Sequence, residues 1–377
     1  MSSTEVAVNL LWCVPGRVGG SEEYLVRQLR GLLEAQEGRS ERWAPTLFCS
    51  RRFTVAHPEL AGVVPTWIGP PGIERRPVRV GVEHTWLAQR TRNFPLVHHG
   101  GGTSPAIGGR PSVLTIHDLQ FLTHPDYHRR VKLGYLRTVV PRSIARATVV
   151  AVPSEWVRTT VVDAYGKDPA LVTVVRHGIE PDLGRVATAP SDVRARYDLG
   201  NGPVLVFPAI THPHKGHRFL LEVMARSWPD PALRLVLLGG AGAAEGEVER
   251  SITALGLGDR VRRPGRVPDA DRDGLVRTAT ALVFPSEYEG FGAPVVEAMA
   301  LGTPVICTDQ PALAEVVGDA GLVLPRDPDA WASALEQVDA RRDELVAAGR
   351  ARAERYSARA AGADLARAYG LAMEVSR

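Results

Sequence analysis

The chain has 377 residues, a length that favours two domains of ordinary size over one. Hydrophobic residues make up 44% and charged residues 23%, an ordinary globular composition that excludes a disordered chain. The formal net charge of +3 is too small to indicate a nucleic-acid partner.

The three cysteines, Cys13, Cys49 and Cys307, lie far apart and show no zinc-ligand spacing. They favour a reducing compartment over a disulfide-bonded one. The N-terminus lacks the basic and apolar regions of a signal peptide, and no apolar run approaches the ~18 residues of a membrane span. We therefore expect a cytoplasmic protein.

Short β-branched runs alternate with longer amphipathic stretches along the first half of the chain. The pattern predicts a helix over 21–36 and strands over 6–12, 113–116, 148–152 and 172–175. The strands are apolar on both faces, which is typical of a parallel sheet covered by helices.

A second series of the same kind begins near Pro203. It predicts helices over 219–226 and 294–300 and strands over 204–207, 233–238, 281–284 and 305–307. The segment 177–197, rich in Gly, Pro and polar residues, is interpreted as the connection between the two series. The chain is therefore predicted to be an α/β protein with two Rossmann-like domains facing across a cleft, whose ligands lie outside the carboxyl ends of the strands.

The segment 286–302 follows a predicted buried strand. Gly290 and Gly292 allow close approach of a ligand, and Pro294 suits the first turn of a helix. The amide groups of Phe291, Gly292 and Ala293 would then form an anion site. Glu289 stands just before this site, and Glu297, one turn into the helix, is placed to accept hydrogen bonds from a ribose diol. The alternative is a plain glycine turn with two solvated glutamates.

This segment resembles the E-x7-E signature of retaining glycosyltransferases of family 4, which have the GT-B fold. Glu289 and Glu297 occupy its two acidic positions, and the resemblance continues through 298–306 and 315–321. It implies the two facing Rossmann-like domains: 1–182 on the acceptor side and 183–356 binding the nucleotide-sugar. It also implies that 357–377 forms a helix crossing back to the first domain, and Ser357 is predicted as its N-cap.

The loop 16–20 is similar to the first glycine loop of this family, in which Gly19 and Gly20 approach the donor diphosphate. On its residues alone, it is either a backbone N–H cradle before a helix or an ordinary glycine turn.

His117, at the end of a predicted strand, is similar to the family histidine that contacts the donor sugar. A neutral imidazole is suited to bonding a sugar hydroxyl, and Asp118 is expected to orient it. A purely structural His-Asp pair is the alternative.

Lys215 is similar to the family lysine that binds the diphosphate, and a dianionic leaving group needs such a cation. Many relatives carry an arginine five or six residues before it, whereas this chain has Ala209 and Ile210. The source of a second positive charge is therefore open; the candidates are His214, His217 and Arg17.

Arg266 and Val267 correspond to a loop that contacts the nucleotide base in relatives. Asp269 and Asp271 follow directly. A D-x-D triplet binds a metal ion in a different glycosyltransferase fold, but here it opens a predicted helix, so we expect capping in place of a metal site.

Between Asp126 and Glu155 the chain carries six cationic residues and no acidic one. They are either solvated side chains or a surface that meets an anionic acceptor or a membrane lipid, so 129–146 is a candidate for weak peripheral contact at the inner face of a membrane.

The sequence as a whole predicts a retaining glycosyltransferase that moves a sugar from a nucleotide-sugar to a hydroxyl acceptor. The resemblance favours mannose from GDP-mannose; the acceptor is an unknown sugar, glycoconjugate or lipid-linked compound. No cofactor and no metal ion are expected. His117, Lys215 and Glu289 are the predicted catalytic residues, and the predicted donor-binding residues are Gly19, Gly20, Arg266, Val267, Gly290, Phe291, Gly292, Ala293 and Glu297. The alternatives are an inactive sugar- or nucleotide-binding protein and a GT-B phosphorylase or epimerase.

Overall fold

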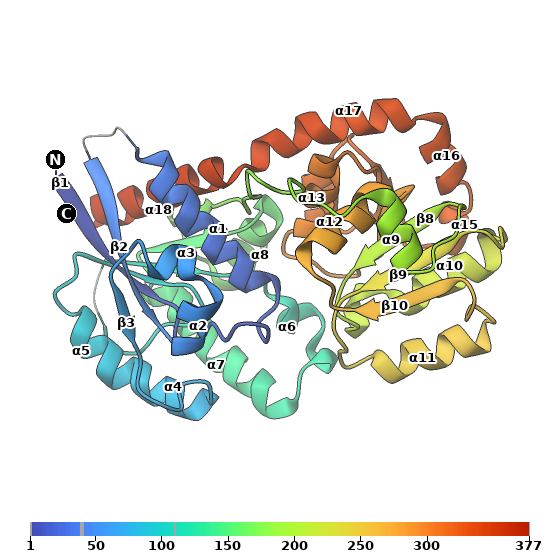
Figure 1. The fold of residues 1–377 in the computed structure, drawn as a ribbon. Coiled ribbons are helices and arrows are strands. Elements are labelled where there is room, and N and C mark those ends of the chain that lie inside the picture. Colours follow the sequence, from blue (N-terminus) through green and yellow to red (C-terminus); the bar gives the residue numbers. More distant parts are fainter. Residues whose placement is uncertain (1, 38–40, 109–110, 377) are drawn as a thin grey trace. The chain divides into compact units, whose positions relative to one another are not determined.

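The computed structural model describes residues 2–37, 41–108 and 111–376. The chain divides into two compact units: unit 1 comprises 1–180 and 356–377, and unit 2 comprises 181–355. Each unit is a parallel sheet with helices on its faces, so the predicted α/β fold class is confirmed (Figure 1).

Unit 1 contains a seven-stranded sheet in the order β3-β2-β1-β4-β5-β6-β7, and every neighbouring pair is parallel. The direction of strand order reverses between β1 and β4, which makes the carboxyl ends of these two strands the switch point where doubly wound sheets bind ligands. The strands are β1 (Ser2–Asn9), β2 (Glu41–Cys49), β3 (Thr66–Ile68), β4 (Leu96–His99), β5 (Ser112–Thr115), β6 (Val149–Val152) and β7 (Val172–Val174).

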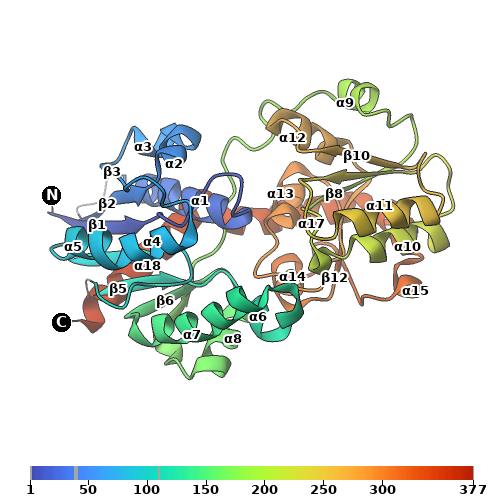
Figure 2. The same cartoon turned by 90° about the horizontal axis from the view of Figure 1, so that it is seen from below.

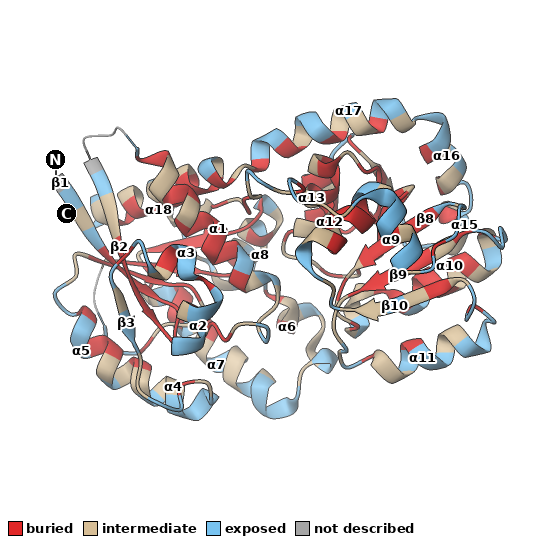
Figure 3. Cartoon of the chain, viewed as in Figure 1, coloured by how far each residue is buried: buried red, intermediate tan, exposed pale blue. Residues whose placement is uncertain are grey.

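The helices of unit 1 cover both faces of its sheet. On β1, Val6 and Val8 pack in one core with α1 and α18, whereas Ala7 packs in a second core on the opposite face. The central strands β4, β5 and β6 are accordingly buried along their whole length, whereas the edge strand β3 is not (Figure 3). The helical elements of this unit are α1 (Gly20–Ala35), α2 (Arg51–Ala56), α3 (Pro58–Ala61), α4 (Arg76–Val82), the π-helix Glu83–Leu87, α5 (Ala88–Thr91), α6 (Gln120–Thr123), α7 (Arg130–Arg146), α8 (Glu155–Tyr165), α18 (Ala358–Val375) and the 3₁₀ turns Pro125–Tyr127 and Pro169–Leu171.

Helices α1 and α18 touch through their backbones. A Cβ atom on Gly31 would lie 1.7 Å from the carbonyl oxygen of Ala358, and one on Gly362 would lie 1.9 Å from the backbone of Gly31. Only glycine fits at both positions, and the first and last helices of unit 1 therefore pack as one layer. The predicted N-cap of α18 is confirmed, because Ser357 Oγ accepts a hydrogen bond from the amide of Ala360 at 3.2 Å.

Unit 2 contains a six-stranded parallel sheet in the order β10-β9-β8-β11-β12-β13. Its switch point lies between β8 and β11, and its helices also lie on both faces (Figure 2). The strands are β8 (Val204–Pro208), β9 (Arg234–Leu238), β10 (Val261–Gly265), β11 (Ala281–Phe284), β12 (Val305–Thr308) and β13 (Leu322–Leu324). The helical elements are α9 (Pro190–Arg196), α10 (His217–Ser227), α11 (Glu245–Ala254), α12 (Asp269–Thr278), α13 (Ala293–Leu301), α14 (Pro311–Val317), α15 (Pro328–Trp331), α16 (Ala334–Ala340), α17 (Arg342–Ala353) and the 3₁₀ turns Pro213–Lys215 and Glu354–Tyr356.

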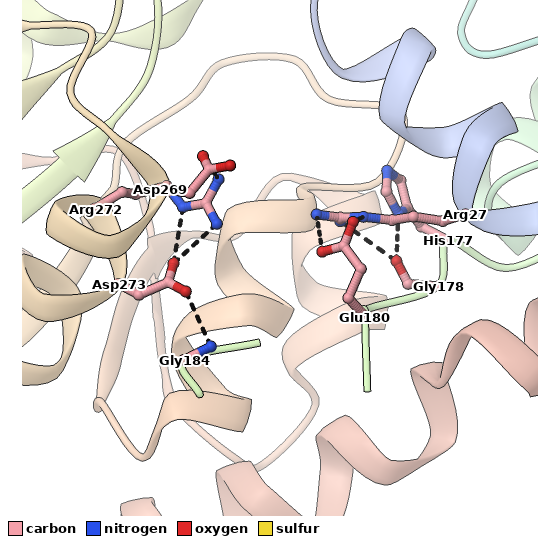
Figure 4. Close-up of polar contacts among 8 residues, drawn as sticks. All are labelled: Arg27, His177, Gly178, Glu180, Gly184, Asp269, Arg272 and Asp273. Atoms are coloured by element: carbon pink, nitrogen blue, oxygen red, sulfur yellow. Dashed lines mark hydrogen bonds and ion pairs between the residues drawn. The ribbon is translucent and has the colours of Figure 1, made fainter. Parts of the chain in front are cut away.

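The connection between the units is shorter than the predicted segment 177–197. On the unit 1 side, Glu180 accepts two hydrogen bonds from Arg27, at 3.1 and 3.0 Å (Figure 4). On the unit 2 side, the amide of Gly184 donates to Asp273 at 2.9 Å. Helix α9 occupies the end of the predicted segment, because Pro190 opens it and Val193 is buried. Each end of the connection is thus fixed within its own unit.

Candidate active site

The switch point of unit 2 brings together two of the predicted catalytic residues. Lys215 follows β8 and Glu289 follows β11, the two strands that flank the reversal of strand order. The Lys215 ammonium donates a hydrogen bond to Glu289 Oε1 at 2.7 Å, and the side chains are 19% and 11% exposed. Lysine and glutamate therefore form one preorganised pair at the place where the fold binds ligands.

The start of α13 lies in the same loop region. Its N-cap is Gly292, with φ 96, and no side chain caps this helix end. A Cβ on Gly292 would lie 2.5 Å from Leu313 Cδ2, so both the backbone angle and the space require glycine. Pro294 stands in the first turn, as predicted. The uncapped amide end of α13, next to Glu289, has the electrostatics of an anion site.

Two polar side chains that the sequence analysis did not single out support this loop from the next strand and helix. Thr308 Oγ1 donates to the carbonyl of Ser286 at 2.6 Å, and Gln310 Nε2 donates to the carbonyl of Glu289 at 3.1 Å. Gln310 Oε1 also accepts from the amide of Leu313 and so caps α14. The available signal was their position at the end of a buried strand and just after it, at the carboxyl edge of the sheet.

Glu297 lies half-buried in α13, and its electrostatic neighbour is Arg272 on α12. Burial would lower the pKa of Arg272, but the carboxylates of Glu297, Asp273 and Asp269 raise it overall. Arg266 follows β10 at the same edge of the sheet and is exposed.

Asp271 is not the cap that the sequence predicted. The N-cap of α12 is Pro268, and Asp271 instead ties α12 to the segment around α9. It accepts hydrogen bonds from Thr188 Oγ1 at 2.5 Å, Tyr197 OH at 2.6 Å and Arg196 Nη1 at 2.5 Å. The bonds from Thr188 and Tyr197, together with the Arg196 guanidinium, lower the pKa of Asp271 to about 2. Its oxygens are thus already occupied by protein donors.

The arginine that this chain lacks before Lys215 is not replaced by His217. The His217 ring is buried against Phe207, with ring centroids 4.5 Å apart. Burial lowers the pKa of His217 to about 4, so the ring is neutral at physiological pH. Gly216 lies between Lys215 and His217 and has φ 77. A Cβ atom there would lie 2.3 Å from the carbonyl oxygen of Pro285, so the turn after Lys215 requires glycine.

The glycine loop of unit 1 lies between β1, which ends at Asn9 at the switch point of that unit, and α1. Helix α1 begins at Gly20, and its N-cap is Gly19, with φ 64 and no side-chain cap. A Cβ built on Gly19 or Gly20 would meet no atom within 4 Å, in contrast to Gly292. Space therefore remains open beside an uncapped helix start, as close approach of a ligand requires.

His117 follows β5 in unit 1. Its Nε2 lies 2.8 Å from the carbonyl oxygen of Gly100, which only accepts, so Nε2 carries the proton and Nδ1 is an acceptor. The hydrogen bond to Gly100 and the charge of Asp118 would raise the pKa of His117, but burial outweighs them and lowers it. The lowered pKa favours the neutral ring. The hydrogen bond that orients the ring is the one to the carbonyl of Gly100, whereas the carboxylate of Asp118 accepts from the amide of Gln120. The orienting role expected for Asp118 stays a prediction.

A buried polar cluster that the sequence analysis missed stands beside these residues, at the ends of β1 and β4. Asn9 Nδ2 lies 3.3 Å from Glu83 Oε1 and 3.4 Å from His99 Nδ1. Burial raises the pKa of Glu83, opposed by Asn9 and Arg79, and lowers the pKa of His99 to about 4. Both shifts favour the neutral form of the group concerned.

The cationic stretch 129–146 forms α7 and its N-cap. Its six cations are Arg129, Arg130, Lys132, Arg137, Arg142 and Arg146. None of them makes an ion pair with any residue that the structure describes. The first three stand at the N-terminus of α7, where the helix dipole disfavours positive charge. The guanidinium of Arg76 lies 5.2 Å from the ring centre of Tyr135 on α7 and adds another cation nearby. Among the described residues, no helix is both long and apolar enough to cross a membrane.

The chain matches two family models, one in each unit. Residues 18–183 match the model "Glycosyltransferase Family 4", and residues 193–355 match "Glycosyl transferases group 1". The chain is 29% identical over 255 residues to O-antigen chain mannosyltransferase B of Escherichia coli, an alignment that covers 65% of this chain and 66% of the relative. It is 30% identical over 306 residues to the D-inositol 3-phosphate glycosyltransferase of Corynebacterium aurimucosum, covering 77% of this chain and 69% of the relative.

The fold also matches solved structures along nearly its full length. HepE of Anabaena, solved with UDP and glucose, aligns with a TM-score of 0.76 and 21% identity over 97% of this chain and 99% of that chain. WaaG, a glycosyltransferase involved in lipopolysaccharide biosynthesis, aligns with a TM-score of 0.70 and 17% identity, covering 97% and 99%. These likenesses show the GT-B architecture of the two units. The family models and the identity to curated relatives together show that the chain belongs to glycosyltransferase family 4 and is a glycosyltransferase.

Proposed function

We propose that this glycosyltransferase moves a hexose from a nucleotide-sugar to a hydroxyl acceptor with retention of configuration at the anomeric carbon. The observation that carries the proposal is the bonded pair of Lys215 and Glu289 beside the uncapped start of α13. It combines a cation for a departing diphosphate, a carboxylate for sugar hydroxyls and a backbone anion site at one edge of the unit 2 sheet.

In the proposed reaction, the bond from the anomeric carbon to the diphosphate oxygen breaks, and a bond to the acceptor oxygen forms on the same face of the sugar. The acceptor proton passes to the departing diphosphate. Lys215 and the Gly290–Ala293 amides stabilise the leaving group, and Glu297 accepts hydrogen bonds from the ribose. Glu289 contacts the sugar, and His117, neutral with Nδ1 as an acceptor, takes a hydrogen bond from a sugar hydroxyl. Gly19, Gly20, Arg266 and Val267 complete the proposed donor contacts.

The proposal is tested by donor turnover in the purified protein. We expect release of a nucleoside diphosphate from one nucleotide-sugar of a panel, with the α-configured sugar in the product of an α-configured donor. The stereochemistry is checked by NMR of the product. Release of a sugar phosphate that depends on added phosphate would instead indicate a phosphorylase, and interconversion of two nucleotide-sugars would indicate an epimerase.

The first candidate for the donor is GDP-mannose. The similarity to an O-antigen chain mannosyltransferase supports it, as do the His-Asp-Leu-Gln and Pro-His-Lys patterns around His117 and Lys215. Thermal shift with GDP, UDP and ADP ranks the bases before any acceptor is known, because a ligand at 100 times its Kd stabilises the folded state by about 2.7 kcal/mol. A larger shift with UDP would overturn the assignment of GDP-mannose.

We further propose that transfer needs no metal ion. Lys215 and two uncapped helix starts supply positive potential to a diphosphate, and the oxygens of Asp271 are taken by Thr188, Tyr197 and Arg196. Transfer should persist in excess EDTA. Activity that disappears and returns only with Mg²⁺ or Mn²⁺ would contradict this proposal.

For the acceptor, we propose a compound with a negatively charged group. The first turn of α7 contains no acidic residue, and Arg129, Arg130 and Lys132 make no ion pair with the described residues, so this end of the helix has more positive charge than its neighbours balance. Arg76 adds a further cation nearby. With a phosphate-bearing acceptor, Lys132→Gln should raise the acceptor KM several-fold, and Arg137→Gln on the same helix serves as the matched control. Loss of binding to anionic vesicles without a change in KM would assign α7 to a membrane surface instead.

A further inference from the structure

The glycine loop of unit 1 is held by a buried chain of charged groups. Glu22 lies in the first turn of α1 and is only 7% exposed. One of its carboxylate oxygens accepts a hydrogen bond from the amide of Gly16 at 3.1 Å, and the other lies 2.8 Å from Nε2 of His57. The carboxylate therefore joins the start of the loop, the start of α1 and a histidine that lies 35 residues later in the chain.

His57 stands between α2 and α3 and is 8% exposed. Its Nδ1 lies 3.1 Å from Glu59 Oε1, and its ring packs 4.8 Å from the ring of Phe53. Both ring nitrogens thus face carboxylates. A carboxylate only accepts hydrogen bonds, so both nitrogens donate only if the ring carries two protons and a positive charge.

The pKa of this histidine follows the same geometry. Burial alone would lower the pKa of His57, but the hydrogen bonds to Glu22 and Glu59 raise it above its ordinary value. The other titratable groups of this site are Glu23, whose pKa burial raises, and the thiols of Cys13 and Cys49. Burial raises the pKa of Cys49 to about 12 and that of Cys13 further, so neither thiol ionises between pH 6 and 9.

We propose that protonated His57 is a positioning residue for donor binding: it holds and neutralises Glu22, which fixes the Gly16–Gly20 loop where the donor diphosphate approaches. The inference rests on the proposed function, because it is that function which brings a diphosphate to the loop. Without its second proton, His57 can donate to only one of the two carboxylates and carries no charge, so the carboxylate of Glu22 would face an incoming dianion uncompensated.

This assignment predicts a pH response with a definite sign. Because the pKa of folded His57 is raised, the charged form persists above the ordinary histidine range and is lost as pH rises through the raised value. Binding of a nucleoside diphosphate should weaken over that interval. A neutral variant should bind weakly at low pH and show no such step.

The experiment measures Kd for GDP, and for UDP if that is the better ligand, by calorimetry from pH 6.5 to 9.5 in wild type, His57→Gln and Glu22→Gln. We expect the ratio of the Kd of His57→Gln to that of wild type to be roughly five- to tenfold at pH 6.5 and to fall to about 1 at pH 9.5. The ligand phosphate titrates equally in both measurements, so its effect on Kd cancels in the ratio. His84→Gln is the matched control, because His84 lies in unit 1 with both ring nitrogens bound to backbone groups; its ratio should stay near 1 throughout.

A second readout requires no ligand. In ¹H–¹⁵N spectra of glycine-labelled protein, the Gly16 amide should shift with the pKa of His57 in wild type and lose that step in Glu22→Gln. This variant keeps the shape of Glu22 and one acceptor oxygen, so it should fold even if His57→Gln does not.

The outcomes separate the inference from the proposed function. If wild type binds no nucleoside diphosphate, the proposed function fails, and the Gly16 titration still tests the link between His57 and the loop. If wild type binds the ligand but the ratio does not change with pH, or if the pKa of His57 lies at or below 6.5, the inference is wrong.

Discussion

The two glycine loops of the molecule are held in chemically different ways. In unit 2, the backbone carbonyls of the loop before α13 are held by neutral donors, from Thr308 to Ser286 and from Gln310 to Glu289. The side chains of Glu287 and Glu289 in this loop pair with Arg326 and Lys215, and no histidine takes part in these contacts. In unit 1, the loop before α1 is supported by the carboxylate of Glu22 and the imidazole of His57. Neutral hydrogen bonds do not titrate near neutrality, whereas a histidine bond does, so the geometry of only one of these two loops is expected to depend on pH.

The loops also differ in how much room surrounds their glycines. Gly292 is enclosed by Leu313, whereas Gly19 and Gly20 face open space. In unit 2, the backbone conformation itself is set by packing. In unit 1, packing leaves the loop less constrained, and the charged contact takes a larger share of the positioning.

The largest expected effect is at the charged centre of unit 2. Lys215→Ala removes the cation that acts on the leaving diphosphate, so kcat/KM should fall roughly 10²–10³-fold with little loss of stability. Steady-state kinetics and a thermal melt measure the two quantities. Arg218→Ala, three residues on in an exposed pair with Glu222, is the control and should leave kcat/KM unchanged. Unchanged kinetics in Lys215→Ala would show that the diphosphate is held elsewhere.

Because Gly292 is enclosed and Gly20 is not, an alanine substitution should destabilise the protein strongly at Gly292 and little at Gly20. Gly292→Ala introduces a side chain at φ 96 and 2.5 Å from Leu313 Cδ2, so the free energy of unfolding should fall by about 2–4 kcal/mol. Gly20→Ala meets no neighbour, and its unfolding free energy should stay within about 1 kcal/mol of wild type. Denaturant titration measures both values. Equal destabilisation by the two substitutions would remove the distinction drawn between the loops.

The units should also respond to pH in opposite directions. The pKa of Asp271 in unit 2 is lowered to about 2, so its ionised form stabilises the fold above the ordinary aspartate pKa, and the stabilisation is lost as pH falls from about 4 to about 2. Because its partner Arg196 is half exposed, solvent screening limits the effect to about 1–2 kcal/mol.

Asp271→Asn should therefore lower stability at pH 7 and flatten the acid limb of the unfolding curve, measured by denaturant titration from pH 2 to 7. His57 has a raised pKa, so its contribution is full below pH 6.5 and is lost as pH rises through the raised value. The control for Asp271→Asn is Asp269→Asn, also on α12, whose carboxylate is exposed and pairs with Arg272. It should leave the acid limb unchanged. An unchanged acid limb in Asp271→Asn would refute the assigned network.

The smallest effect concerns the neutral support of the unit 2 loop. Thr308→Val keeps the shape of the side chain and removes the hydrogen bond to Ser286, which is worth about 1 kcal/mol. A loss of about this size in kcat/KM, roughly fivefold, should be the same at every pH from 6.5 to 9. A loss that grows or shrinks across this interval would mean that the unit 2 loop depends on a titrating group after all.

The strand and helix pattern along the chain predicted the architecture because its strands are buried on both faces. Strands β2, β3, β4, β10 and β13 were not predicted. Of these, β2 contains Pro45, and β4 ends in His98 and His99. Both histidines are buried, and their burial depends on partners far along the chain, such as Tyr369, which lies 2.9 Å from His98 Nδ1. Sequence alone treats such residues as exposed and ends the strand before them.

The candidate site was predictable where a local motif carries the chemistry and not where tertiary contacts do. The loops, Lys215 and Glu289 were readable from glycine spacing and charge, and the roles assigned to them remain predictions. The direct bond between Lys215 and Glu289 joins residues 74 positions apart. The partners of Asp271 and the link from His57 to Glu22 likewise depend on how distant segments fold together, which spacing does not encode.

The backbone contact between α1 and α18 has a consequence for the order of events during synthesis. Gly31 is translated more than 300 residues before Ala358 and Gly362, the residues of α18 that its backbone contacts. Unit 1 therefore cannot complete its helix layer until α18 leaves the ribosome, whereas all of unit 2 has emerged by then. Unit 2, although translated second, is therefore free to fold first. Until α18 is synthesised, the surface of α1 that packs against it stays exposed. During synthesis, unit 1 is therefore the part of the chain that most needs a chaperone.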